Sequence, residues 1–412
     1  MKRTVILFEN KKQCCGCGVC SIVCPIQAIE MVADENGFVY PRIQEEKCNC
    51  CGLCKKTCAF QKQNEYNISK VVYALSIKDK KSLLQSASGG AFAGIAENWI
   101  KEGGVVFGAA LASYNGKLIP CHMMAQTQED LLPILGSKYV QSDVGRKFYE
   151  VKKFLEKGRK VLFSGTPCQI AGLKSWLRKD YSELLTIDLV CHGVPNAKMF
   201  RDYIEVEEEK LGKSIEDFRF RDKENGWGLN AKIYYTTNGK RSTVVIPSNQ
   251  SSFYELFLRG EIYRENCYNC PYANGRHPAD LTLGDYWGIE IEHPEYLRPK
   301  GMLDQKDGIS MLMVNTEKGE DVFEMYKDVF WYYSSSFEKA SKHNEQLRHP
   351  SIPGANREKI LILYQKKGYQ SVDSWYWTKK RRENWGENAK NCLHKCIPSP
   401  VRNILKKMLR RE

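Results

Sequence analysis

Residues 14–25 read Cys-Cys-Gly-Cys-Gly-Val-Cys-Ser-Ile-Val-Cys-Pro, and this stretch decides how the chain begins to fold. Cysteines at 14, 17, 20 and 24 give the spacing C-x2-C-x2-C-x3-C, which returns at 48, 51, 54 and 58. In two-cluster iron–sulfur proteins such a run gives three thiolates to one 4Fe-4S cube, and its fourth reaches the neighbouring cube. The repeat therefore predicts two cubes, one held by Cys14, Cys17, Cys20 and Cys58, the other by Cys48, Cys51, Cys54 and Cys24.

The glycines of these runs support a loop wrapped around a cube. Gly16, Gly18 and Gly52 stand between ligands, where such a loop needs backbone angles that glycine adopts most easily. A pair of zinc knuckles is the alternative, but it needs only C-x2-C pairs and leaves the four-cysteine runs unexplained. Cys15 and Cys50 are extra thiols, expected to lie beside the ligands without a role.

Composition predicts a soluble cytoplasmic protein of two or three domains. The chain has 412 residues, 42% of them apolar, and a mean hydropathy of −0.49. No apolar run approaches the roughly 20 residues of a membrane span. Ten of the 17 cysteines lie within the first 58 residues, which favours clusters over a disulfide framework and a reducing compartment.

The pattern along the chain predicts an α+β protein. A hairpin is expected from 28–32 and 38–43 around Asn36-Gly37. Strands alternating with helices then predict an α/β core with a mixed sheet, followed by a β-rich C-terminal region. The expected divisions are a two-cluster ferredoxin-like domain at 1–66, the first part of the core at 67–214, its second part at 215–345, and an aromatic and basic tail at 346–412.

The expected elements follow from hydrophobic periodicity and turn residues. Helices are expected from about 91 to 103 and at 148–157, 252–260 and 317–330. Strands are expected at 71–77, 105–111, 161–163, 184–190, 218–221, 231–236, 242–246, 280–283 and 310–314.

A third group of cysteines stands at suggestive places. Cys168 lies where a helix should begin, an electropositive position that favours a thiolate, and Cys191 ends a buried strand. Cys267 and Cys270 form a C-x2-C pair followed by Pro271. Taken singly, Cys168 and Cys191 are typical inert buried thiols; together with the pair they suggest a ligand set. A four-thiolate zinc site remains open on spacing alone.

At this point the chain resembles the coenzyme F420 hydrogenase/dehydrogenase beta-subunit family, with a fused two-cluster ferredoxin domain. The resemblance covers roughly residues 10–340 and rests on ordered motifs. These are Ser88-Gly89-Gly90, Ser164-Gly165-Thr166-Pro167-Cys168-Gln169, Asp188-Leu189-Val190-Cys191-His192-Gly193, Phe220-Arg221-Asp222-Lys223, Cys267-x2-Cys270-Pro271-Tyr272-Ala273 and Gly284-Asp285-Tyr286-Trp287-Gly288.

The resemblance implies a flavin, usually FAD, close to a third 4Fe-4S cluster with Cys168, Cys191, Cys267 and Cys270 as ligands. It implies an oxidoreductase that couples one-electron transfer through the clusters to two-electron flavin chemistry on the deazaflavin coenzyme F420 or another small acceptor. Its partners would be ferredoxin or another one-electron carrier and a small-molecule hydride donor or acceptor. The alternatives are a subunit that delivers electrons to a partner enzyme, or a ferredoxin-dependent reductase in polysaccharide or sugar biosynthesis.

Contacts to the flavin are expected from turns, because no GxGxxG follows an early strand. Ser88-Gly89-Gly90 opens a helix and offers free N–H groups to a phosphate, although the same residues make an ordinary helix start. The other candidates also have ordinary explanations as solvated, capping or turn residues. They are Lys138, Thr166 and Asp285 as cofactor contacts, and His192 as a proton carrier.

The C-terminal residues are strongly basic. Residues 379–412 carry a net charge of +8 out of the chain's +13. Val401, Ile404, Leu405 and Met408 follow helical spacing, with basic residues on the other side, which is typical of a helix that contacts an anionic membrane surface. We therefore expect peripheral contact with the inner membrane face; a helix that caps the core is the alternative. No nucleic-acid module accompanies the charge, so no nucleic-acid partner is expected.

Overall fold

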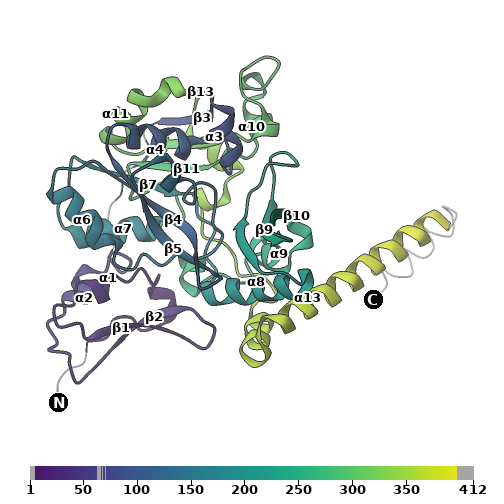
Figure 1. The fold of residues 1–412 in the computed structure, drawn as a ribbon, viewed down its shortest axis with the longest axis horizontal. Helices are drawn as coiled ribbons and strands as arrows, with labels where there is room; N and C mark the ends of the chain where they lie inside the picture. The colour runs from purple at the N-terminus through teal and green to yellow at the C-terminus, as the bar shows by residue number, and fades with distance from the viewer. Residues whose placement is uncertain (1–4, 63–65, 67, 70, 397–412) are drawn as a thin grey trace, which may run out of the picture.

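The computed structural model describes residues 5–62, 66, 68–69 and 71–396, with side chains as far as residue 384. An eight-stranded mixed sheet forms the centre, in the order β13-β3-β12-β11-β7-β6-β4-β5 (Figure 1). Three pairings in this order are parallel: β11 with β7, β7 with β6, and β6 with β4. The other pairings are antiparallel. The strands are β3 (Val71–Ile77), β4 (Val105–Tyr114), β5 (Lys117–Ala125), β6 (Val161–Ser164), β7 (Leu184–Leu189), β11 (Leu281–Asp285), β12 (Ser310–Val314) and β13 (Phe330–Ser335).

The central strands are the ones that composition predicts best. β6 and β12 are buried along their whole length, as expected for strands covered on both faces. The expected strands at 71–77, 105–111, 161–163, 184–190, 280–283 and 310–314 are confirmed within a few residues. β5 was not predicted, because Pro120 interrupts its pattern; as the edge strand it tolerates a residue without an N–H.

Helices cover both faces of the sheet. On one face α4 (Ala91–Lys101) and α11 (Glu317–Tyr326) pack over the core that includes Leu75, Val106 and Leu185. On the other face α6 (Lys147–Glu156) and α7 (Pro167–Leu177) pack over alternate residues of the same strands. Shorter helices are α3 (Lys80–Gln85), α5 (Gln128–Leu131), α10 (Ile289–Glu292) and α12 (Phe337–Lys342).

A second sheet of three antiparallel strands stands beside the first, in the order β10-β9-β8. Its strands are β8 (Ile215–Arg219), β9 (Asn230–Thr237) and β10 (Lys240–Pro247), and an aromatic-rich core joins them to α8 (Ala197–Leu211) and α9 (Ser252–Leu258). The strands after residue 215 therefore divide between two sheets. β11, β12 and β13 complete the large sheet, so the β-rich region is not a separate layer.

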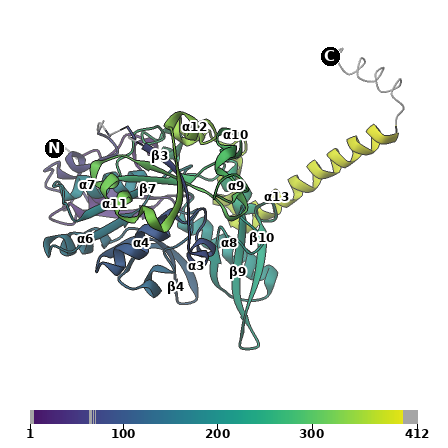
Figure 2. The ribbon, with the colours of Figure 1, turned by 90° about the horizontal axis from the view of Figure 1, so that it is seen from above.

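The last described helix, α13 (Arg357–Cys396), is broken at Gly368, whose φ of 70° and ψ of −178° are not helical. Tyr364, Tyr369, Val372 and Tyr376 are buried in the core shared with α8 and α9, so this part of the expected tail packs on the body. Figures 1 and 2 both show the far end of α13 projecting away from it. The expected amphipathic helix at 401–409 lies outside the described residues. Along the part of the chain that the structure describes, no helix is both long and apolar enough to span a bilayer.

The N-terminal segment has the expected hairpin and two short helices. β1 (Ile29–Ala33) pairs with β2 (Val39–Ile43), and Gly37 turns the chain between them with a φ of 86°. The carboxylate of Asp34 accepts hydrogen bonds from the N–H groups of Asn36 (3.0 Å) and Phe38 (2.8 Å), which fixes this turn. A single-turn η1 (Lys11–Gln13) precedes α1 (Val19–Ile22), and α2 (Leu53–Thr57) follows the hairpin.

This segment packs closely against α7. The side chain of Val19 belongs to the core under α6 and α7, and a Cβ on Gly172 would lie 3.1 Å from it. Ser175 donates to the carbonyl of Thr57 at 2.6 Å, and Tyr149 donates to the carbonyl of Ile22 at 2.7 Å.

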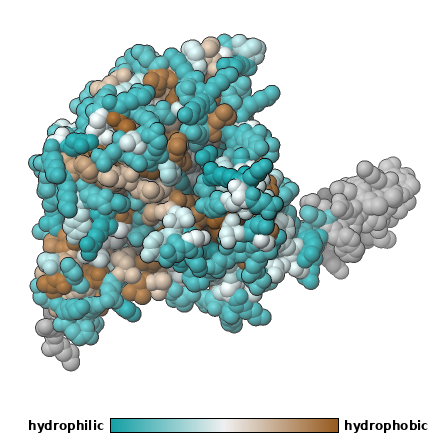
Figure 3. All heavy atoms as spheres, viewed as in Figure 1, coloured by the Kyte–Doolittle hydropathy of each residue, from teal (hydrophilic) through white to brown (hydrophobic). Residues whose placement is uncertain are grey.

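In Figure 3 the viewed face is mainly hydrophilic, with brown patches toward the lower left, where Figure 1 draws the N-terminal segment.

Candidate redox site

The first cysteine run folds as a tight loop that brings its thiols to the end of α2. Gly16 and Gly18 have φ of 67° and 79°, which lets the loop reverse and then start α1. Burial raises the pKa of Cys20, and the nearby thiols of Cys17, Cys14 and Cys58 add to that effect. The structure thus brings together the four residues assigned to cluster one, around a small cavity beside Phe60.

The second run leads into α2 through Gly52, and Cys54 lies within that helix. Burial raises the pKa of Cys54, and the thiols of Cys24 and Cys51 add to it, so the fourth cysteine of the first run lies with the second run. Cys48 is in the same loop, where its sulfur accepts from the N–H of Cys50 at 3.4 Å. The crossed assignment of Cys24 and Cys58 therefore agrees with these neighbourhoods, and the ligand roles stay a prediction.

The third set converges at the carboxyl edge of the large sheet. β6 and β7 are parallel neighbours; Cys168 follows β6 as the second residue of α7, and Cys191 follows β7. Cys267 lies in the short helix η3 (Glu265–Asn269), and Cys270 ends it. Burial raises the pKa of Cys191 well above its usual value, and the thiols of Cys267, Cys168 and Cys270 add to that rise.

Cys15 links the first run to the third set, which the sequence did not predict. It is 4% exposed, and hydrogen-bonding interactions with the thiols of Cys168 and Cys17, followed by burial, raise its pKa. The same contact lowers the pKa of Cys17 to about 7 and lowers that of Cys168. Cys15 therefore lies between a sulfur of the first run and a sulfur of the third set. Only the fold could have shown this, because the adjacency of Cys14 and Cys15 gives no sign of it.

These groups of thiols have the chemistry of iron–sulfur ligands, and the clusters themselves stay a prediction. Among the described side chains, no three of His, Cys, Asp and Glu gather closely enough to hold one metal ion. A cube has four iron atoms and takes one thiolate at each, so its ligand sulfurs stand apart at separate corners. Convergent thiols without carboxylate or imidazole among them are the donor set that iron–sulfur clusters use.

The candidate flavin contacts fall into two groups. Asp285 ends β11, whose parallel neighbour β7 leads to His192, so both stand at the sheet edge where Cys168 and Cys191 lie. Burial lowers the pKa of His192, while the nearby carboxylate of Asp285 opposes it. Ligands of α/β sheets bind at such carboxyl edges. Asp285 forms an ion pair with Arg221, with 2.8 Å between Oδ2 and Nη1.

Ser88, Gly89 and Gly90 join this group through Lys223. The ammonium of Lys223 donates to the carbonyls of Ser88 (2.6 Å) and Leu83 (2.7 Å). Gly90, with a φ of 80°, starts α4. A Cβ on Gly89 would lie 2.3 Å from the carbonyl oxygen of a residue in β3 and 2.5 Å from an N–H of β12, so close strand packing alone requires this glycine. Its role as a flavin contact remains a prediction.

Lys138 and Thr166 make structural contacts instead. Lys138 donates to the carbonyls of Ile134 (2.9 Å) and Leu135 (2.8 Å), and burial lowers its pKa to about 7. Thr166 caps α7 in a reciprocal arrangement with Gln169, and its hydroxyl lies 3.2 Å from the sulfur of Cys168. Thr166 is therefore placed beside the third cysteine set, whereas the ammonium of Lys138 is held by backbone carbonyls.

Arg221 and Lys223 are the residues that sequence reasoning missed at this site. Both lie in a motif quoted for the family resemblance, yet neither was proposed as a contact. The side chain of Arg221 is 2% exposed and donates to Asp285, to the carbonyl of Gly228 (2.7 Å) and to the hydroxyl of Tyr139 (2.9 Å). The sequence signal for this site was the pair of basic residues at the end of an expected strand. Buried positive charges suit a phosphate or an anionic ring.

A series of buried, hydrogen-bonded polar side chains lies next to the start of α7, which carries Cys168 of the third set. His122 lies 3.0 Å through Nε2 from the carbonyl of Ser164 and 3.0 Å through Nδ1 from the hydroxyl of Ser142. Gln169 donates to the carbonyl of Ser142 at 3.1 Å and accepts from the N–H of Thr166 at 3.0 Å. This series thus fixes the start of α7, where the sulfur of Cys168 is presented.

The buried imidazole of His122 should make the free energy of unfolding depend on pH. Burial lowers its pKa to about 4, against about 6.5 in an unfolded chain. Between those values the unfolded chain binds more protons, so the free energy of unfolding should fall by up to about 3 kcal/mol as pH drops from about 6.5 to about 4. His122→Gln should lose this part of the pH dependence in urea unfolding, while the exposed control His349→Gln should keep it. A full wild-type slope in His122→Gln would contradict the assignment.

Comparison with known proteins gives a family match over the site. Residues 158–332 match the family described as the C terminus of the beta subunit of coenzyme F420 hydrogenase/dehydrogenase. This range holds the third cysteine set and the Arg221–Asp285 pair.

Two curated relatives extend beyond that range. The chain is 28% identical to the coenzyme F420-dependent sulfite reductase of Methanocaldococcus jannaschii over 75% of this chain and 45% of that protein. It is 24% identical to the F subunit of the F420H2 dehydrogenase of Methanosarcina mazei, over 76% of this chain and 82% of that protein. The chain spans about half the length of the first curated relatives it matches.

A solved structure, a xenon derivative of the F420-reducing NiFe hydrogenase complex from Methanosarcina barkeri, is also similar. It has 16% identity and a TM-score of 0.43, over 78% of this chain and 95% of that one.

Proposed function

We propose that this chain is an oxidoreductase that exchanges electrons between a one-electron carrier and a small hydride donor or acceptor, because residues 158–332 match the C terminus of the coenzyme F420 hydrogenase/dehydrogenase beta subunit. Coenzyme F420 is the first candidate for that small molecule, since a curated relative is named for its dependence on it. The proposed cofactors are two 4Fe-4S clusters in the N-terminal segment, a third at Cys168, Cys191, Cys267 and Cys270, and FAD.

The observation that carries the proposal is the packing of the first cysteine loop on α7, the helix whose second residue is Cys168; a Cβ on Gly172 of this helix would lie 3.4 Å from the sulfur of Cys17. It places a proposed ligand of the first cluster next to a proposed ligand of the third. The third set shares its sheet edge with His192 and Asp285, the proposed flavin contacts. Flavin and iron–sulfur groups held there would supply the conversion between two-electron and one-electron transfer.

The residues at the sheet edge suit an anionic cofactor. Arg221 and Lys223 bring two buried cations against one carboxylate, Asp285. Burial lowers the pKa of Lys223 to about 8, so an approaching phosphate would favour its charged form. His192 stands beside Asp285 at this edge, where it would exchange a proton during hydride transfer.

Turnover of the purified chain tests this proposal. Anaerobic protein is mixed with reduced coenzyme F420 and oxidised ferredoxin, and formation of oxidised coenzyme is followed by its absorbance. Catalytic turnover by this chain alone supports the proposal. Protein that contains its clusters and flavin, yet gives no turnover in either direction with F420 or with other small hydride carriers, would contradict it.

A second candidate is an electron-transfer subunit whose substrate chemistry belongs to a partner. The match to the F subunit of F420H2 dehydrogenase, over 82% of that protein, favours it. The discriminating result is reduction of the bound cofactors by dithionite without turnover of any small molecule until a partner is added. Contact of the C-terminal basic residues with a membrane remains a proposal, to be tested by comparing vesicle binding of the full chain and of residues 1–396, which keep the buried part of α13.

A further inference from the structure

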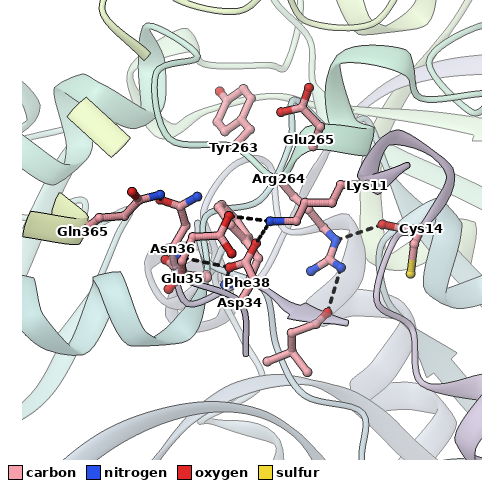
Figure 4. A network of polar contacts seen from close by, with 12 residues as sticks. Lys11, Cys14, Asp34, Glu35, Asn36, Phe38, Tyr263, Arg264, Glu265 and Gln365 are labelled. Atoms are coloured by element: carbon pink, nitrogen blue, oxygen red, sulfur yellow. Dashed lines mark hydrogen bonds and ion pairs between the residues drawn. The ribbon is translucent and has the colours of Figure 1, made fainter. Parts of the chain in front are cut away.

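Arg264 is the largest side chain that the structure buries completely within its described residues. It directly precedes η3, the helix that carries Cys267, and its own N–H donates to the carbonyl of Val194 at 2.9 Å. Its side chain turns toward the N-terminal segment (Figure 4). The backbone of Arg264 thus lies next to the helix that carries Cys267 of the third set. Its side chain contacts the loop that carries the first run.

All the hydrogen-bond acceptors of this guanidinium are neutral. Nε donates to the carbonyl of Cys14 (3.1 Å), Nη2 to the carbonyl of Val39 (2.7 Å) and Nη1 to the side-chain oxygen of Gln141 (3.3 Å). The centre of the Tyr40 ring lies 4.0 Å away. Within the part of the chain that the structure describes, no Asp or Glu forms an ion pair with Arg264.

The neighbouring carboxylates are taken by other cations. Lys11 binds Asp34 at 2.6 Å and Glu35 at 2.7 Å, as Figure 4 shows, and Arg357 binds Glu265 at 3.2 Å. A buried charge without a counter-ion costs several kcal/mol, so proteins pair such charges. The missing anion must therefore come from the groups that face this guanidinium from other directions.

Those groups are the thiols of two cysteine sets. The guanidinium is bonded through Nε to the backbone of Cys14, and Arg264 stands three residues before Cys267. The loop of the first run is shaped to this cation, since a Cβ on Gly16 would lie 2.8 Å from its guanidinium atoms.

We propose that Arg264 is the buried counter-ion shared by the first and third cysteine sets, and that it raises the reduction potentials of the clusters they hold. The inference rests on the proposed function. Each added electron makes a thiolate-bound cluster more negative, so a fixed positive charge beside it favours the reduced state. Net charge and hydrogen bonds near the sulfurs are known to set such potentials. Arg264 acts here as a positioning residue, because it touches the ligand loop.

Two variants cancel the positive charge in different ways, one by removing it and one by adding a carboxylate beside it. Arg264→Gln should lower the equilibrium constant for reduction at the first and third sets at least tenfold, about 59 mV for a one-electron couple. Gln141→Glu keeps the guanidinium but supplies the carboxylate it lacks, and should shift the same potentials in the same direction. Arg264→Lys retains the charge and should stay closer to wild type. The measurement is a redox titration followed by electron paramagnetic resonance.

The control is Arg42→Gln, which removes the same charge from a side chain that is 67% exposed, and should leave the potentials unchanged. Iron and sulfide content are measured in every variant. Full cluster content with unmoved potentials in Arg264→Gln and Gln141→Glu would overturn this inference and leave the proposed function standing. Wild-type protein without iron would overturn both. Should Arg264→Gln fail to fold, Gln141→Glu alone decides.

Discussion

Cys270→Ala is expected to lose about one third of the bound iron, because one of three cubes loses a ligand while the other two keep theirs. Cys270 belongs to the set at the sheet edge, where burial and then the thiols of Cys168 and Cys267 raise its pKa. The N-terminal runs form their own loops around α1 and α2. Iron and sulfide analysis of anaerobic protein, with visible absorbance, measures the loss, and turnover should fall to background.

Cys121→Ala is the matched control, since Cys121 lies in β5 outside the three sets. It should keep the wild-type iron content. Loss of all the iron in Cys270→Ala would contradict separate sites, and unchanged iron would remove Cys270 from the ligand set. Cys51→Ala should give the reverse pattern, in which the third site keeps its iron.

Asp285→Asn is expected to destabilise the protein by about 3–5 kcal/mol, because it leaves a buried guanidinium without its anion. The pair is bidentate, with Oδ1 3.4 Å from Nη2 and Oδ2 2.8 Å from Nη1 of Arg221. The Arg221 side chain is 2% exposed, so water cannot replace the carboxylate. Urea unfolding measures the loss, and flavin content should fall with it if Asp285 orders the proposed flavin site.

The exposed pair of Arg241 and Asp217, 3.8 Å apart, provides the control. Asp217→Asn should change stability by at most about 1 kcal/mol, because exposed pairs are screened. Replacing both buried partners, Arg221→Met with Asp285→Leu, should recover most of the lost stability. Wild-type stability in Asp285→Asn would show that the ion pair does not hold this edge of the sheet together.

The strands and the hairpin that depend on neighbouring residues could be predicted from the sequence. Val71–Ile77 and Ser310–Val314 are the bounds of β3 and β12, because buried apolar runs between turns leave few alternatives. The hairpin around Gly37 followed from its turn residues. The spacing of the cysteines also predicted which thiols lie together, including the exchange of Cys24 and Cys58 between the two runs.

Contacts between distant segments could not be predicted. Cys15 and Cys168 are brought together by the packing of α1 on α7, and neither residue has a pattern that points to the other. Arg264 reads in the sequence as one basic residue among many, and its burial against Cys14 depends on the docking of the whole N-terminal segment. Arg221, two residues after β8, and Asp285 at the end of β11 are paired in the same way.

The central claim is that thiolate-bound iron in the N-terminal segment and an organic cofactor at the sheet edge form one electron relay. The most direct measurement is the iron, sulfide and flavin content of anaerobically purified chain, followed by reduction with one equivalent of a two-electron donor. The account predicts about twelve iron atoms and one flavin per chain, with electrons shared between cluster and flavin signals. Colourless protein that releases neither iron nor flavin on denaturation would contradict it.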